Sequence, residues 1–207
     1  MNMTEPGSDQ FLQLVFDAFG EIGNIAMGSA VTSLSNIFPC SREIHQLIRV
    51  CELDTFHSMI PEEIREEKAV GAVVSFAGDF FGELLFIFRE PFARQCLKSL
   101  LRREPIRVLG DTEAYIALAE IANLMASAYL SAISFYTHGR AEILNTVLAE
   151  DMVGAMTVEC AGRSIFFGNR AVSIEGEFMA ADTKNYIVLL LREAERLSLE
   201  KCLGLRK

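Results

Sequence analysis

The chain has 207 residues, of which 51% are hydrophobic, and its 19 basic and 28 acidic side chains give a net charge of −9. This apolar content is enough for a folded core and excludes a disordered, collagen-like or low-complexity chain. The negative charge argues against partners that need a cationic protein surface, so we expect no nucleic acid and no membrane among them. The length fits one domain, or two closely packed halves.

Targeting and metal-binding signals are not expected either. The N-terminal MNMTEPGSDQ has no basic region of the kind that begins a signal peptide, and apolar runs such as 82–88 and 186–191 are shorter than the roughly 20 residues that cross a bilayer. The five cysteines are widely spaced without a CxxC pair, which favours reduced thiols and a cytoplasmic location. The three histidines form no HxH or HExxH pattern, so no metal site is predicted.

Periodicity and turn residues predict helices alternating with paired strands. The expected elements in chain order are a helix over 11–38, either continuous or joined near Gly28 and ended by Pro39; an extended segment over 42–54; a hairpin of 69–76 and 80–88; a helix over 92–101; a helix over 111–137; an ambiguous stretch, 138–163, with a strand and a short helix; a hairpin of 164–177 and 186–191; and a closing helix over 193–203.

This order repeats within the chain. EIGN at 21–24 matches EIAN at 120–123, and FIFREPFARQCL at 86–97 matches LLLREAERLSL at 189–199. We therefore predict a single domain, 1–207, with internal repeat halves of about 9–103 and 111–207. Each half would hold a long helix, an extended segment, a β-hairpin and a short helix, which gives an α/β (α+β) fold with a largely antiparallel sheet covered by helices. Neither GxGxxG nor GxxxxGK[ST] occurs, so no nucleotide-binding site is predicted.

The candidate chemistry lies on the two long helices. Asp17, Glu21 and Asn24 are spaced i, i+4 and i+7, so they share one helix face, and Glu120 and Asn123 repeat the last two positions. A carboxylate can pair with a cation of a docked partner, and a carboxamide can orient a water molecule because it both donates and accepts hydrogen bonds. Glycines and other small residues beside the motif would let a partner approach closely. The alternative interpretation is an ordinary solvated helix surface.

The sequence resembles the CheC-type phosphatases of chemotaxis, the CheC, CheX and FliY group. EIGNIAMGSAVTSLSNIF resembles the first signature helix, EIANLMASAYLSAIS resembles the second signature helix of the two-site CheC branch, and VSFAGDFFGELLFIF resembles the central hairpin. The resemblance extends over about residues 10–205. It is weak only in 138–163 and in the acidic loop 61–68.

The resemblance implies a phosphatase that hydrolyses the aspartyl phosphate of a CheY-like response regulator. The catalytic residues would be Glu21, Asn24, Glu120 and Asn123, with Asp17 in support. Each Asn would orient the attacking water and each Glu would pair with a receiver lysine, whereas Asp17 would support the docking at its edge. The receiver supplies Mg²⁺, so the phosphatase has no cofactor or metal of its own. A second partner implied by the family is the deamidase CheD.

Three positions depart from the family pattern. Ile116 occupies the first motif position of the second copy, where the family has an acid or serine. The family often has a proline about 23 residues after the Asn, and Leu47 and Thr146 stand at those places here. The alternative function is a non-catalytic binding protein for a response regulator, for CheD or within the flagellar switch.

Other residues carry weaker signals. Asp79 lies in the Gly-Asp turn of the first hairpin, where local hydrogen bonding is its expected role. The histidines and Cys160 have no neighbouring partners in the sequence that would make a catalytic group, so we expect surface or buried structural roles for them.

Overall fold

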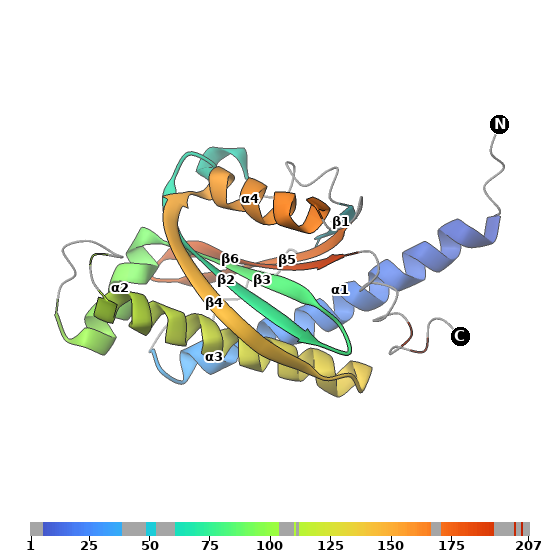
Figure 1. Ribbon diagram of the computed structural model, residues 1–207, viewed down its shortest axis with the longest axis horizontal. Coiled ribbons are helices and arrows are strands. Elements are labelled where there is room, and N and C mark those ends of the chain that lie inside the picture. The colour runs from blue at the N-terminus through green and yellow to red at the C-terminus, as the bar shows by residue number, and fades with distance from the viewer. Residues whose placement is uncertain are drawn as a thin grey trace.

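The computed structural model of the chain describes residues 6–38, 49–52, 61–103, 110, 112–166, 171–192, 201 and 204. A six-stranded antiparallel sheet forms its middle layer, with α1, α2 and α3 on one face and α4 on the other (Figure 1). The predicted α/β class and antiparallel sheet are confirmed. The elements are α1 (Pro6–Ser35), β1 (Arg49–Glu52), the 3-10 helix η2 (Glu62–Ile64), β2 (Lys68–Gly78), β3 (Gly82–Arg89), α2 (Glu90–Leu101), α3 (Thr112–Thr137), β4 (Ala141–Met152), α4 (Val153–Phe166), β5 (Ala171–Ala180) and β6 (Thr183–Arg192).

The strand order is β1-β5-β6-β3-β2-β4, so each half of the chain contributes its first strand to the hairpin of the other half. The two hairpins meet at β3 and β6, where Leu85 is paired with Val188. These two residues are 103 positions apart, which is also the offset between the Arg-Glu dipeptides that begin at Arg89 and Arg192. The order therefore has the two-fold symmetry that a repeat would give, while the duplication itself stays a prediction.

Two apolar cores lie on opposite faces of the sheet. The larger core joins α1, α2 and α3 to the sheet and contains most of the fully buried aromatic rings. Phe88, Phe92 and Phe178 connect β3, α2 and β5 through two edge-to-face contacts with centroid distances of 5.3 and 5.8 Å. The smaller core lies beneath α4 and includes Val153, Met156 and the apolar residues of β3 and β6 that face it. The two cores are possible because alternate residues of a strand point to opposite faces.

Glycines in the sheet let the helices come close to it. A Cβ atom at Gly176 of β5 would lie 1.8 Å from Cε of Met27 in α1. A Cβ atom at Gly71 of β2 would lie 2.3 Å from Sδ of Met156 in α4. Both methionines therefore pack directly on the strand backbone, one on each face, and a larger residue at either glycine would force the end of that methionine side chain to move.

The β5–β6 hairpin has an unusual turn sequence. Its two loop residues, Ala181 and Asp182, both have positive φ, of 53° and 52°, where two-residue hairpins normally favour Asn-Gly. Fully buried Asn185 supports the turn: its Nδ2 donates to the carbonyls of Thr183 and Ala180 at 3.1 and 3.4 Å. Its Oδ1 accepts from the backbone N–H of Arg89 at 2.9 Å, which links the turn to the end of β3.

Most predicted elements are confirmed, with corrections in the second half. The first helix is continuous through Gly28, and the stretch 138–163 does hold a strand followed by a helix. The predicted strand start at Ser164 is wrong, because α4 continues to Phe166 and β5 begins at Ala171. The apolar residues of that segment suggested a strand, but α4 packs Val153, Met156 and Cys160 onto the sheet at helical spacing.

The second half also departs from the predicted unit, because α4 lies between its extended segment and its hairpin. The corresponding part of the first half contains η2 among the residues that the structure describes. Most of the extended segment 42–54 and of the closing helix 193–203 lies outside the described residues, as does Pro39.

Within the described part of the chain, one helix, α3, is long and apolar enough to cross a membrane by length and composition. The sequence predicted a helix here, over 111–137, but the search for membrane spans considered only shorter apolar runs. More than half of its apolar window is buried, and α3 packs against α1 and the sheet. Burial also raises the pKa of Tyr129, which lies on its inner side. The apolar composition of α3 therefore belongs to a core helix.

Candidate functional site

The first candidate site is on the exposed side of α1. Asp17 and Glu21 are exposed, and Asn24 is half-buried. Val15, Phe19 and Ile22, on the other side of the helix, are buried in the larger core. The helix therefore separates a polar face from an apolar one, as its periodicity predicted. The structure brings the three polar residues onto one outward face.

The second candidate site has the same placement on α3. Glu120 is exposed and Asn123 is half-buried, while Leu118, Ile121 and Ala122 are buried behind them. Ile116 stands one turn before Glu120 and is 54% exposed. The position that carries an acid in α1 thus carries an exposed apolar side chain in α3.

The two helices contact each other on the same face of the sheet (Figure 1). Both Glu–Asn pairs consequently lie on the outer surface of one helical layer, although the pairs are 99 residues apart in the sequence. A partner that docks on this layer would meet side chains of α1 and α3, with Thr146 of β4 beside Asn123.

Beyond Asn24, the side chains on the surface of α1 are small, so they add little bulk above the helix backbone. A Cβ atom at Gly28 would meet no other atom within 4 Å, so the space over this glycine is open. The hydroxyls of Ser29 and Ser33 donate back to the carbonyls of Ile25 and Ala30, at 3.0 and 2.6 Å. Glycine within a helix costs about 1 kcal/mol relative to alanine. No packing contact within the described residues explains that cost, whereas close approach of a partner would.

Thr146 contacts the second site from β4. Its Oγ1 donates a hydrogen bond to Oδ1 of Asn123, 23 residues earlier in the chain. Two residues further on, the backbone N–H of Leu148 donates to Oη of Tyr115 at 3.3 Å. Sequence analysis had noted Thr146 only as a residue in place of the family proline, and missed this contact. The spacing of 23 residues marked the position, but no local pattern in the sequence predicts the contact.

The remaining candidates have structural roles or no partners for chemistry. The backbone N–H of Asp79 donates to the carbonyl of Arg140, and its Oδ2 accepts from the N–H of Arg140, both at 2.8 Å. Asp79 therefore ties the first hairpin turn to the start of β4, a turn role as expected. His138 is exposed at the end of α3, and His45 and His57 lie outside the described residues. Among the described residues, no three His, Cys, Asp or Glu side chains gather as a metal site.

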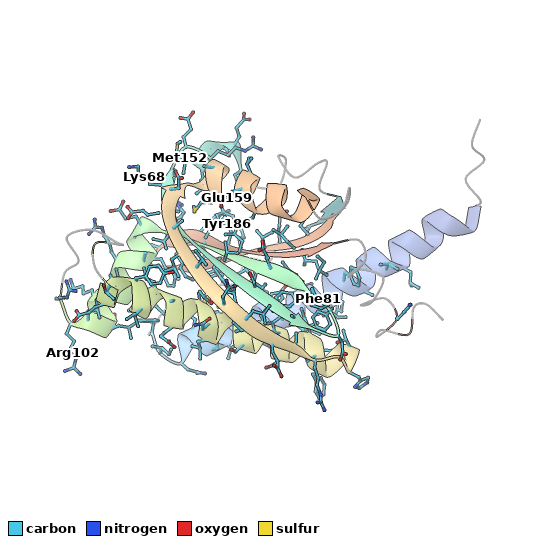
Figure 2. The ribbon with its side chains drawn as sticks, viewed as in Figure 1. Lys68, Phe81, Arg102, Met152, Glu159 and Tyr186 are labelled. Atoms are coloured by element: carbon cyan, nitrogen blue, oxygen red, sulfur yellow. The ribbon has the colours of Figure 1, made fainter. Side chains whose placement is uncertain are left out.

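A small pocket lies on the opposite face of the sheet, beneath α4. Gly71, Val73 and Val147 line it from the strands, and Met156 and Cys160 line it from α4. Figure 2 labels Glu159 of α4 and Tyr186 of β6 on this side of the sheet. Burial, and then the nearby Glu177 carboxylate, raise the pKa of Tyr186. The sheet separates this pocket from both Glu–Asn pairs, so it is not part of the candidate site.

Comparison with known proteins agrees with the resemblance found in the sequence. The sequence model of the CheC-like family matches residues 14–40, which include Asp17, Glu21 and Asn24. The resemblance to the CheC-like group is confirmed, while assignment to its two-site branch stays a prediction.

Solved structures share the fold over most of their length. FliY from Thermotoga maritima matches with a TM-score of 0.66 and 16% identity, over 100% of both chains. A structure described as the CheX–CheY–BeF₃–Mg²⁺ complex from Borrelia burgdorferi matches with a TM-score of 0.55 and 14% identity, over 82% of this chain and 97% of that one. The middle domain of FliM from Vibrio alginolyticus matches with a TM-score of 0.56 and 9% identity, over 88% and 97%. At these identities the similarity shows the fold.

Proposed function

We propose that this chain, whose first helix matches the CheC-like family and whose fold is that of CheX and FliY, dephosphorylates the aspartyl phosphate of a CheY-like response regulator. The observation that carries the proposal is the pair of Glu–Asn motifs on the exposed surface of one helical layer. It would act in the cytoplasm, in chemotaxis or a related two-component pathway.

In the proposed reaction, a water molecule attacks phosphorus in line with the bond to the aspartyl oxygen. The P–O bond breaks, the receiver carboxylate leaves, the water proton passes to solvent, and inorganic phosphate is released. Catalysis of this step depends mostly on positioning and on charge stabilisation. Asn24 and Asn123 would orient the attacking water. Mg²⁺ held by the receiver would neutralise charge on the phosphoryl oxygens, so no metal of this chain takes part.

The acidic residues would fix the docking register. Glu21 and Glu120 are exposed on their helices and would each pair with a receiver lysine. Asp17, one turn before Glu21, would support the docking at its edge. The charge of −9 gives no general attraction to an acidic receiver site, so docking would depend on these local pairs and on close helix contact. Salt should then weaken binding only modestly.

The test is to follow loss of phosphate from a CheY-like receiver of the same organism, labelled with acetyl phosphate in the presence of Mg²⁺. The wild-type protein should accelerate the decay, and N24A/N123A should not. A receiver held in the active state by beryllofluoride reports binding separately from chemistry. If N24A/N123A retains full activity, the assignment of the carboxamides is wrong.

The alternative is a binding protein of the flagellar switch, which the fold shared with FliY and the FliM middle domain favours. Formation of a complex with the beryllofluoride-loaded receiver, without any change in phosphate decay, would support this function. CheD, the other proposed partner, would be tested by adding it to the same assay and measuring binding and decay rate.

A further inference from the structure

We infer that Thr146 is a positioning residue that fixes the carboxamide of Asn123 for the reaction at the α3 site. The inference rests on the proposed function and adds to it a residue from outside the two signature helices. Three features carry the inference. A bulge in β4 directs Thr146 toward α3, the Thr146 hydroxyl bonds to Asn123, and the matching position of the first copy has no hydroxyl.

A β-bulge directs Thr146 toward α3. Phe76 of β2 is paired with Ile143 of β4, but Ser75 is paired with Asn145, so Leu144 is an extra residue in β4. As a result Thr146, rather than Asn145, lies opposite Val74. Val74 belongs to the core between the sheet and the long helices. Directly paired residues point to the same face of a sheet, so the bulge turns the Thr146 hydroxyl toward α3.

The backbone around Thr146 is anchored to the same helix. Leu148, two residues on and on the same face of β4, is 7% exposed and belongs to the larger core. Its backbone N–H donates to Oη of Tyr115, an earlier residue of α3. The hydroxyl is thus presented by a strand that is attached to α3 at two points.

The hydrogen bond determines how the carboxamide faces the partner. The terminal torsion of Asn is broad and roughly two-fold, so an unattached carboxamide samples both orientations. Oδ1 can only accept, and here it accepts from the Thr146 hydroxyl. The second lone pair of Oδ1 stays open to the attacking water, and the Nδ2 group keeps its two N–H donors for the water and the phosphoryl oxygens. Within the described part of the chain, no partner competes for these donors.

The first copy has no hydroxyl-bearing residue at the position that matches Thr146. The residue 23 positions after Asn24 is Leu47, whose side chain carries no hydrogen-bond donor. The two sites would therefore hold their carboxamides by different means, and a change at Thr146 should affect only the α3 site.

The experiment measures each site alone. In an N24A background, the remaining decay of the phosphorylated receiver reports the α3 site. We expect T146V, which keeps the side-chain shape, to lower kcat about three- to tenfold, as loss of one hydrogen bond would. KM should stay unchanged because Glu120 is intact. T146S, which keeps the hydroxyl, should restore most of the rate. In an N123A background T146V should have no effect, since the group that it positions is gone.

A second measurement reads the positioning without catalysis. Nitrogen-15 relaxation of the Asn123 side-chain amide should show a rigid group in the wild type and in T146S, and increased motion in T146V. Thermal unfolding of the variants checks that the fold is retained.

Each other outcome overturns the inference. Equal rates for N24A and N24A/T146V would show that the hydrogen bond has no catalytic effect. An equal defect in T146S and T146V would indicate a packing role. If the N24A variant had no residual activity, the α3 site would be inactive and Thr146 could not have a positioning role in catalysis. Failure of the proposed function itself looks different: the wild-type protein would not accelerate the decay at all, and the inference would fall with it.

Discussion

The α1 and α3 sites share a Glu–Asn pair at equivalent helix positions but differ in the residues around it. One turn before the Glu, α1 has the exposed acid Asp17, and α3 has Ile116, which is 54% exposed. Four residues after the Asn, α1 has Gly28, over which the surface is open, and α3 has Ser127. The α1 site is the more polar and the flatter of the two.

The support behind each pair differs as well. Thr146 of β4 bonds to the carboxamide of Asn123, whereas the matching sequence position of the first copy is Leu47. One motif placed twice on one helical layer therefore has two different surroundings. We therefore expect the catalytic rate at each Glu–Asn pair to depend also on the residues around it, which lie outside the Glu–Asn motif.

The largest expected effect comes from removing the carboxamides. N24A and N123A should each abolish the contribution of one site, and the double variant should lose about 100-fold, as removal of a group that positions the reaction does. Phosphate decay under single-turnover conditions checks this. If the sites are independent, the residual rates of the two single variants add up to the wild-type rate. A single variant as inactive as the double would contradict two independent sites.

A smaller effect is expected from the docking carboxylates. E21Q and E120Q keep the shape and remove the charge, so each should raise the KM of its own site about two- to fivefold, the range of an exposed ion pair. The kcat should stay the same. Titration of the beryllofluoride-loaded receiver at two salt concentrations measures the charge contribution. A fall in kcat at constant KM would show that Glu acts in the chemical step.

The first motif position can be restored in the second copy. I116D in an N24A background should lower the KM of the α3 site about twofold, because it supplies the missing acid at an exposed position. V158D is the matched control: Val158 is similarly exposed, at 49%, but lies on α4, on the other face of the sheet. An equal change in both variants would mean that the effect is one of overall charge.

The smallest expected change concerns stability. G28A should raise the free energy of unfolding by about 1 kcal/mol and Tm by roughly 2–4 °C, because alanine favours the helix and the added Cβ meets no other atom. It should also slow the α1 site, because the new methyl group faces the partner. S127A, at the matching position of α3, is the control and adds no bulk. A stable G28A with full α1-site activity would argue against close docking over Gly28.

The sequence predicted the parts of the fold that depend on local patterns. The two long helices have a sustained apolar period, so their buried faces followed from the spacing of residues such as Val15, Phe19 and Leu118. The hairpin β2–β3 had a Gly-Asp turn signal. The turn of β5–β6 had no such signal, because its positive-φ residues are Ala181 and Asp182, and the hydrogen bonds of buried Asn185 that support the turn include one to Arg89 of β3. The end of α4 was missed because packing on the sheet overrode the strand-like composition of 164–166.

For the site, the sequence by itself determined the chemistry and the helix face. The i, i+4 and i+7 spacing is a local property of one helix, so Asp17, Glu21 and Asn24 had to share a face, and the repeat located Glu120 and Asn123. Only the tertiary structure decided that α1 and α3 form one layer and that Thr146 lies against Asn123. That contact depends on strand pairing and on a single extra residue in β4, and pairing between distant segments leaves no periodic trace in the sequence.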